Sequence, residues 1–122
     1  MPNYWFDHIQ LMSPDPSETA AFYEKMFGAR KVAEGNTRDG RAIVNLDLNG
    51  TTILVFQQAS DDAPTGLVHF GIGRDDLATA VPELKALGVE FTMEVRELRP
   101  DFTISFLTAP ENVSIELQEG NP

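Results

Sequence analysis

The sequence predicts an α+β fold in which two tandem βαβββ modules form a cupped mixed sheet with the helices on its outer face. The order strand, helix and then three strands occurs twice along the chain. The two copies also align, because His8 precedes Gly28 by almost the same interval as His69 precedes Gly88. We therefore expect one domain over residues 1–122, with module 1 at about 1–60 and module 2 at about 66–122.

The first module opens with a strand over residues 4–12, where apolar and polar positions alternate. The run Ser13-Pro14-Asp15-Pro16 interrupts this strand and supplies a cap and a first-turn proline, so a helix is expected over 16–27, ending at Gly28. The dipeptides Asp39-Gly40 and Asn49-Gly50 are typical of tight hairpin turns. They separate three further strands, expected at residues 30–35, 41–49 and 51–58.

The second module begins after a polar linker at residues 59–65, with a strand over 66–73. Asp75-Asp76 would cap a helix running to Leu87, with Gly88 as its end. Pro82 conflicts with the middle of a helix, and a later helix start would place it in the first turn. Three strands are expected at residues 90–97, 102–109 and 112–119.

Composition excludes several classes of protein. The 122 residues include no cysteine, which excludes disulfide scaffolds, thiolate zinc sites and thiol nucleophiles. Nine basic against 19 acidic residues give a net charge of −10, which argues against nucleic-acid binding and against a polybasic membrane anchor. The chain has neither a secretory leader pattern nor a long apolar run, so we expect a cytoplasmic protein with no membrane partner.

The duplication gives the two histidines equivalent positions. In the strand of residues 4–12, Ile9 and Leu11 can face the helix, which leaves His8 on the opposite face. The same alternation places His69, and Glu116 in the final strand, opposite their module's helix. Two imidazoles and one carboxylate are a ligand set for Zn, Ni, Co, Mn or Fe, with positions left open for substrate. The alternative is that none of these residues binds a metal, because a histidine in a strand is commonly just hydrogen-bonded and a glutamate on a strand is commonly just solvated.

Other side chains are candidates for contact with a small-molecule substrate in the predicted cup. Gln10 and Gln118 share the faces of the predicted ligands and could orient substrate oxygens, although each could equally be a surface amide. Phe56 could line an apolar pocket or simply pack in the core.

The chain resembles the vicinal oxygen chelate superfamily, which includes glyoxalase I, methylmalonyl-CoA epimerase, extradiol dioxygenases and the fosfomycin and bleomycin resistance proteins. The resemblance rests on segments spread over nearly the whole chain: Asp7-His8-Ile9, residues 22–29 (FYEKMFGA), 67–72 (LVHFGI), 83–89 (ELKALGV) and 106–117. It implies a cupped sheet around a divalent metal held by His8, His69 and Glu116, within a homodimer.

The resemblance also implies a further ligand position, which falls on Leu54. Leucine cannot bind a metal, and Gln58 is a weak substitute four residues further along. An apolar residue here matches the pattern of extradiol dioxygenases and fosfomycin-type transferases. Glyoxalase I and the epimerase normally keep four ligands.

Three functions therefore stay open. The leading prediction is a metal-dependent lyase or isomerase of glyoxalase or epimerase type, in which vicinal oxygens of a carbonyl or thioester substrate are chelated and Glu116 moves a proton through an enediolate. The alternatives are an Fe(II) extradiol-type dioxygenase and a bleomycin-resistance-like binding protein.

Overall fold

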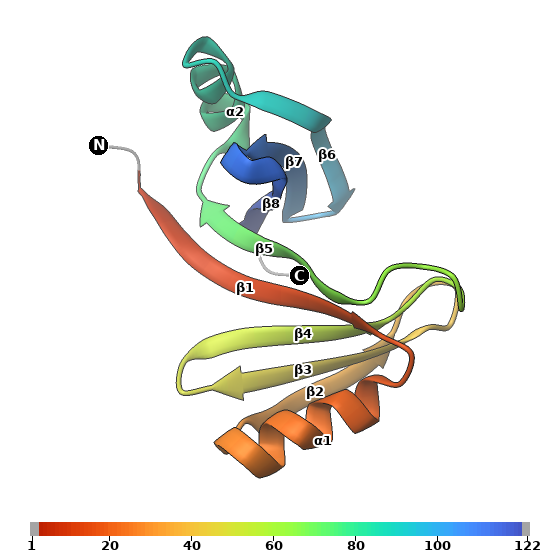
Figure 1. Ribbon diagram of the computed structural model, residues 1–122. Helices are drawn as coiled ribbons and strands as arrows, with labels where there is room; N and C mark the ends of the chain where they lie inside the picture. The colour runs from red at the N-terminus through yellow and green to blue at the C-terminus, as the bar shows by residue number, and fades with distance from the viewer. Residues whose placement is uncertain (1–2, 121–122) are drawn as a thin grey trace. The chain divides into compact units, whose positions relative to one another are not determined.

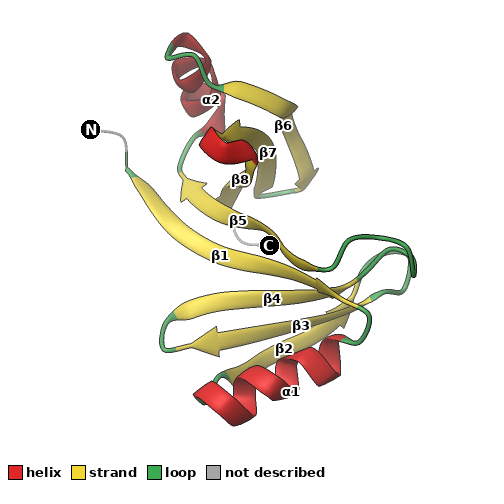
Figure 2. Ribbon diagram, viewed as in Figure 1, coloured by secondary structure: helices red, strands yellow, loops and turns green. Residues whose placement is uncertain are grey.

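The computed structural model describes residues 3–120 and confirms the predicted fold class (Figure 1). Its eight strands and two α-helices follow the predicted order and are coloured by type in Figure 2. Their bounds are β1 (Tyr4–Ser13), α1 (Pro16–Phe27), β2 (Arg30–Asn36), β3 (Ala42–Leu48), β4 (Thr51–Gln57), β5 (Gly66–Arg74), α2 (Leu77–Ala86), β6 (Glu90–Arg99), β7 (Phe102–Ala109) and β8 (Val113–Gly120). A short 3₁₀ turn, Pro110–Asn112, precedes β8.

The strands follow the order β2-β3-β4-β1-β5-β8-β7-β6 in a mixed sheet. The parallel pairs are β1 with β4 and β5 with β8, whereas the hairpin neighbours are antiparallel. By its contacts the chain divides into two units, one of residues 8–68 and one of residues 3–7 with 69–120. Strand β1 therefore contributes residues to both.

In the unit of residues 8–68, α1 packs on one face of β3 and β4. Alternate residues of these strands, such as Val44, Leu46, Ile53 and Val55, are buried against Ala20 of the helix. The hairpin between β3 and β4 turns at Asn49-Gly50, where both residues have positive φ, as a two-residue turn of this type requires. The hairpin predicted from this dipeptide is confirmed.

Helix α1 has the predicted bounds because the expected capping residues are present at both of its ends. The Asp15 carboxylate accepts a hydrogen bond from the Glu18 backbone N–H at 3.2 Å, and Pro16 stands in the first turn. Gly28 ends the helix in the left-handed conformation.

In the other unit, α2 packs on β6 and β8 through Leu77, Ala80 and Val81. These side chains are buried with Leu107 and Leu117 of the sheet. The alternative of a later helix start is wrong, because α2 begins at Leu77 directly after its Asp76 cap and holds Pro82 in its interior. Pro82 lies on the exposed side of the helix, where the backbone bond lost to its missing N–H is accessible to water.

Most remaining differences from the predicted bounds are one or two residues at strand ends. The last strand begins at Val113 rather than Asn112, because Glu111 and Asn112 both take positive φ in the preceding turn. Within residues 3–120, neither helix has the length and apolar character needed to cross a membrane.

Candidate metal centre

Strands β5 and β8 place His69 and Glu116 on the face of their unit that is opposite α2. Ile72, Ile115 and Leu117 pack with the helix, so the alternate residues of each strand point the other way. Phe106 of β7 pairs with Glu116 across the antiparallel ladder, and directly paired residues share a face. We call this surface the His69 face; it is formed by His69, Gly71 and Gly73 of β5, Glu116 and Gln118 of β8, and Phe102, Ile104 and Phe106 of β7.

The two potential ligand atoms on this face are close together and shielded from water. His69 Nε2 lies 3.7 Å from Glu116 Oε1, and the side chains are only 7% and 13% exposed. Two ligands about 2.1 Å from one tetrahedral ion lie about 3.4 Å apart, so the observed spacing is close to what a shared cation needs. An imidazole nitrogen beside a carboxylate oxygen is also a donor set for borderline divalent metals. The pair therefore fits a divalent cation.

Neighbouring side chains hold this pair in place. The Phe106 ring meets the His69 imidazole edge to face, with 5.2 Å between ring centroids and an interplanar angle of 79°. Glu119, three residues beyond Glu116, faces the helix instead, and its carboxylate accepts a hydrogen bond from the Leu77 backbone N–H at 2.8 Å. The two carboxylates of β8 thus have different surroundings, and only Glu116 is beside an imidazole.

Gln118 is the most deeply buried polar residue predicted for the substrate site on this face. It is 2% exposed, and its Oε1 atom accepts no hydrogen bond from the described residues. A buried amide oxygen of this kind needs a donor, which a ligand or a water molecule can supply. Gly73 pairs with Gln118 on β5 and adds no side chain that would cover it.

The unit of residues 8–68 contains the other predicted site residues. His8 is 1% exposed, pairs with Thr52 of β4, and lies opposite α1, as the alternation of β1 predicts. Gln10 pairs with Leu54, and Leu54 pairs with Asn45 of β3. The position to which the sequence resemblance assigns a further ligand is therefore a leucine between two amides.

Phe56 and Gln58 lie further along this unit. Phe56 shares the face of Leu54 and pairs with Met12 of β1. The side-chain amide of Gln58 donates to the Ala63 carbonyl oxygen at 2.9 Å, and its backbone N–H donates to Ser13. Gln58 thus anchors the loop that follows β4.

Sequence reasoning missed the position of the single tryptophan. A Cβ atom built on Gly73 would lie 2.7 Å from Trp5 Cζ2 and closer still to Cε2 and Nε1. Because that Cβ would point to the side of His69, the indole covers Gly73 on the His69 face. A lone tryptophan in the opening strand together with glycines at alternate positions of β5 was the available signal.

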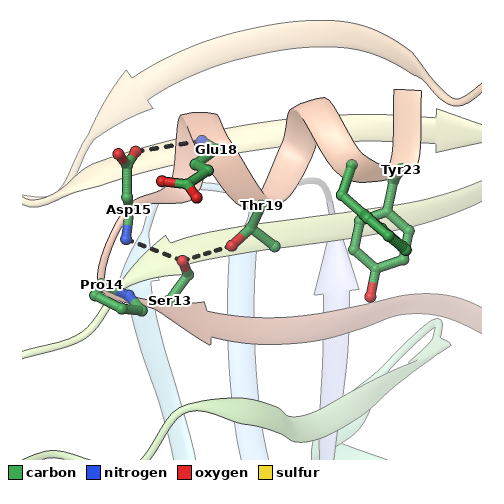
Figure 3. A pocket seen from close by; sticks show the side chains of 7 residues that line it. Ser13, Pro14, Asp15, Glu18, Thr19 and Tyr23 are labelled. Carbon is green, nitrogen blue, oxygen red and sulfur yellow. Dashed lines mark hydrogen bonds between the residues drawn. The ribbon is translucent and has the colours of Figure 1, made fainter. Parts of the chain in front are cut away.

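Two pockets in the unit of residues 8–68 lie away from these residues. One, of about 370 Å³, is beside the start of α1 (Figure 3). Its polar groups bond to one another: the Ser13 hydroxyl accepts from the Asp15 backbone N–H and shares a 2.6 Å hydrogen bond with the Thr19 hydroxyl. The other adjoins it along Leu11, Met12 and residues 65–67. Neither pocket is lined by a predicted metal ligand or substrate-binding residue.

Comparisons with known proteins agree with this architecture. A hypothetical protein from Bacillus halodurans C-125 matches with a TM-score of 0.81 and 19% identity, over 98% of this chain and 96% of that one. Methylmalonyl-CoA epimerase from Mycobacterium tuberculosis matches with a TM-score of 0.75 and 21% identity, over 96% and 88%. A variant of the Streptomyces coelicolor methylmalonyl-CoA epimerase, in complex with 2-nitronate-propionyl-CoA, matches with a TM-score of 0.74 and 18% identity, over 97% and 98%.

At these identities the solved structures show a common fold. None of the curated protein sequences compared with this chain matches it. The family description "Glyoxalase/Bleomycin resistance protein/Dioxygenase superfamily" matches residues 5–117, which is almost the whole chain. The predicted resemblance is confirmed, and the chain belongs to the glyoxalase, bleomycin resistance protein and dioxygenase superfamily.

Proposed function

We propose that this protein is a metal-dependent lyase or isomerase of the glyoxalase or epimerase type. The observation that carries the proposal is the buried pair of His69 and Glu116, 3.7 Å apart on neighbouring strands. We propose His8 as the third ligand, because it is buried and occupies the position in the first module that His69 occupies in the second. Superfamily members commonly bind a divalent metal, which supports the assignment.

A divalent cation held by these residues would supply Lewis acidity toward the vicinal oxygens of a carbonyl or thioester substrate. Glu116 is the proposed base: its carboxylate takes up the proton from the carbon next to the substrate carbonyl, which leaves an enediolate. Returning the proton to the neighbouring carbon isomerises the substrate, whereas epimerisation needs a proton delivered to the opposite face of the same carbon by a donor other than Glu116. Burial of His69 and Glu116 lowers the local dielectric, which strengthens the electrostatic stabilisation of the negative charge that develops on the substrate.

The remaining predicted residues have binding roles in this proposal. The Oε1 atom of Gln118 would accept a hydrogen bond from the substrate, because it accepts none from the described residues. Gln10 would orient a substrate oxygen, while Leu54 and Phe56 would form an apolar wall beside it.

The test is proton exchange at the substrate carbon. The metal-loaded protein is incubated in D₂O with methylmalonyl-CoA, or with the hemithioacetal of methylglyoxal and glutathione, and deuterium incorporation is followed by NMR. Wild type should incorporate deuterium into one of these substrates, and Glu116→Gln should lower the rate at least about a hundredfold, the range of a lost general base. Absence of exchange with both substrates at full metal occupancy would contradict the proposal.

Leu54 favours a second candidate function, an Fe(II) extradiol-type dioxygenase. Two histidines and one carboxylate with no fourth protein ligand are the donor set of non-haem Fe(II) oxygenases. For this test, Fe(II) is loaded under anaerobic conditions, and oxygen consumption is then measured after oxygen and catechol are added. Oxygen consumption by a protein that shows no deuterium exchange in the first assay would select this function.

A further inference from the structure

We propose that the outer face of α1 is an interface between two copies of this chain, which pack there as an antiparallel helix pair about a two-fold axis. Helix α1 lies along the strands of its own unit and buries Pro16 and Ala20 (Figure 1). The outer face is the opposite side of the helix and consists of the exposed residues Glu18, Ala21, Phe22, Lys25 and Met26. None of these is a predicted metal ligand or substrate-binding residue, so the proposal stands apart from the proposed reaction.

Large apolar side chains are exposed on this face and at the end of the helix. Phe22, Met26 and Phe27 are 52%, 59% and 60% exposed. The Phe22 ring makes edge-to-face contacts with Tyr23 and Phe27, with ring centroids 5.5 Å and 5.9 Å apart, and Met26 is one helical turn from Phe22. Single exposed apolar side chains are ordinary on a protein surface, whereas a contiguous group rimmed by charged residues marks an interaction site.

The charged residues of the outer face are arranged so that the face is complementary to itself. Glu18, Ala21, Phe22 and Lys25 follow the i, i+3, i+4, i+7 spacing of a single stripe. Neither Glu18 nor Lys25 makes an ion pair with another of residues 3–120. A two-fold axis between Ala21 and Phe22 brings residue 18 of each chain to residue 25 of the other. Each carboxylate then meets an ammonium group, and each Phe22 ring packs on the small Ala21 side chain of the other helix.

This symmetry identifies a second copy of the chain as the partner. In a two-fold interface the same patch is used by both subunits, so the patch has to be its own complement. A parallel pair of helices would instead place Glu18 beside Glu18 and Lys25 beside Lys25, and like charges at an interface are unfavourable. Although the chain carries a net charge of −10, the charges of Glu18 and Lys25 cancel within the stripe.

The exposed apolar area is of the size that such an interface needs. Each of Phe22, Met26 and Phe27 is more than half exposed, and side chains of this size bury about 150–250 Å² each, so together they present roughly 300 Å² per chain. A standard interface buries about 800 Å² per partner, a little over half of it apolar. These side chains would therefore supply most of its apolar centre, with Glu18 and Lys25 at the rim.

The ordinary use of the exposed rings is to stabilise the end of α1 through contacts with one another. That role needs no second chain, and it does not depend on the signs of the charges at positions 18 and 25. An interface does depend on them, and this difference is measurable.

The test exchanges the two charges. Glu18→Lys and Lys25→Glu are made separately in the full chain, and self-association is measured by sedimentation equilibrium for wild type, for each variant alone and for an equimolar mixture of the two. Wild type should associate. In each variant alone two ion pairs become two like-charge contacts, so the Kd of self-association should rise at least about tenfold.

The mixture should associate about as tightly as wild type, because one chain then carries two cations on the stripe and the other carries two carboxylates. A helix damaged by substitution would not recover on mixing, so this arm separates a lost interface from a lost fold. Asp61→Lys and Arg38→Glu are the matched controls, because they make the same charge changes at exposed loop positions of the same unit and should leave the Kd unchanged.

Three results would overturn the proposal. The first is a wild type that stays monomeric at about millimolar concentration. The second is self-association of the single variants that is as tight as that of wild type, which would place any contact between copies on another surface. The third is a mixture that associates no more tightly than its components.

Discussion

Gly73→Ala should destabilise the protein and move its only tryptophan. The added Cβ would lie 2.7 Å from Trp5 Cζ2, well inside the normal contact distance of about 3.5–4.0 Å. If the ring stays in place, the strain should cost about 1–3 kcal/mol, as overpacking does elsewhere. If the ring leaves, it loses the burial of a side chain that is 41% exposed. With about 250 Å² for a whole tryptophan and about 25 cal/mol per Å², the upper limit is about 4 kcal/mol.

The assay is urea unfolding followed by both circular dichroism and tryptophan emission. The sequence contains a single tryptophan, so emission reports only Trp5, and its native maximum should shift to longer wavelength in the variant. Gly35→Ala is the matched control, because Gly35 is also a strand glycine, has no positive φ, and nothing lies within 4 Å of its built Cβ. It should be neutral or stabilising by up to about 1 kcal/mol. Equal free energies of unfolding for the two variants, with unchanged native emission, would refute this account of Trp5.

Three further predictions concern stability. Leu117→Ala should lower the free energy of unfolding by about 2–5 kcal/mol, because Leu117 is 2% exposed in the core beneath α2; a loss under about 1 kcal/mol in chemical denaturation would contradict that core. Asp15→Ala should lower the free energy of unfolding by about 1 kcal/mol, because α1 loses its cap, whereas Asp15→Asn should retain most of that free energy. An equal loss in both variants would exclude capping as the cause. The Thr37 hydroxyl, followed by the Arg41 guanidinium, lowers the pKa of Asp39. The contribution of the Asp39 carboxylate to the stability of the fold is therefore complete above its unfolded-state pKa and is lost as the pH falls through its folded-state pKa. Asp39→Asn should therefore differ from wild type at neutral pH and converge with it in acid, and a difference that is constant with pH would disprove this linkage.

Local signals predicted most of the fold. Helix α1 has its expected ends because Asp15, Pro16 and Gly28 are independent signals at its two boundaries. The faces of His69 and Glu116 also followed from alternation, since β5 and β8 pair over residues 70–73 and 115–118 without a register shift. Pro82 shows the limit of such rules, because burial of Leu77, Ala80 and Val81 outweighs one missing backbone bond.

The arginines of β6 show what alternation alone could not predict. Residues three apart in a regular strand point to opposite faces, yet Arg96 and Arg99 both pair with residues of the His69 face. Register shifts between Met93 and Arg96, and between Glu97 and Arg99, change the alternation locally. The proximity of Trp5 to Gly73 was also missed by alternation alone, because it joins two strands that are distant in sequence.

Metal binding to the purified full chain tests the central claim most directly. Calorimetric titration of the metal-free protein with Zn²⁺ and Ni²⁺ should give one site per chain. The variants His8→Ala, His69→Ala and Glu116→Ala should each lower the metal affinity by about tenfold to a hundredfold or more. Glu97→Gln is the control, since this carboxylate pairs with Thr103 on the opposite face of β7 and should leave the affinity unchanged. A wild-type chain that binds no divalent cation, or variants that bind it as tightly as wild type, would contradict the account.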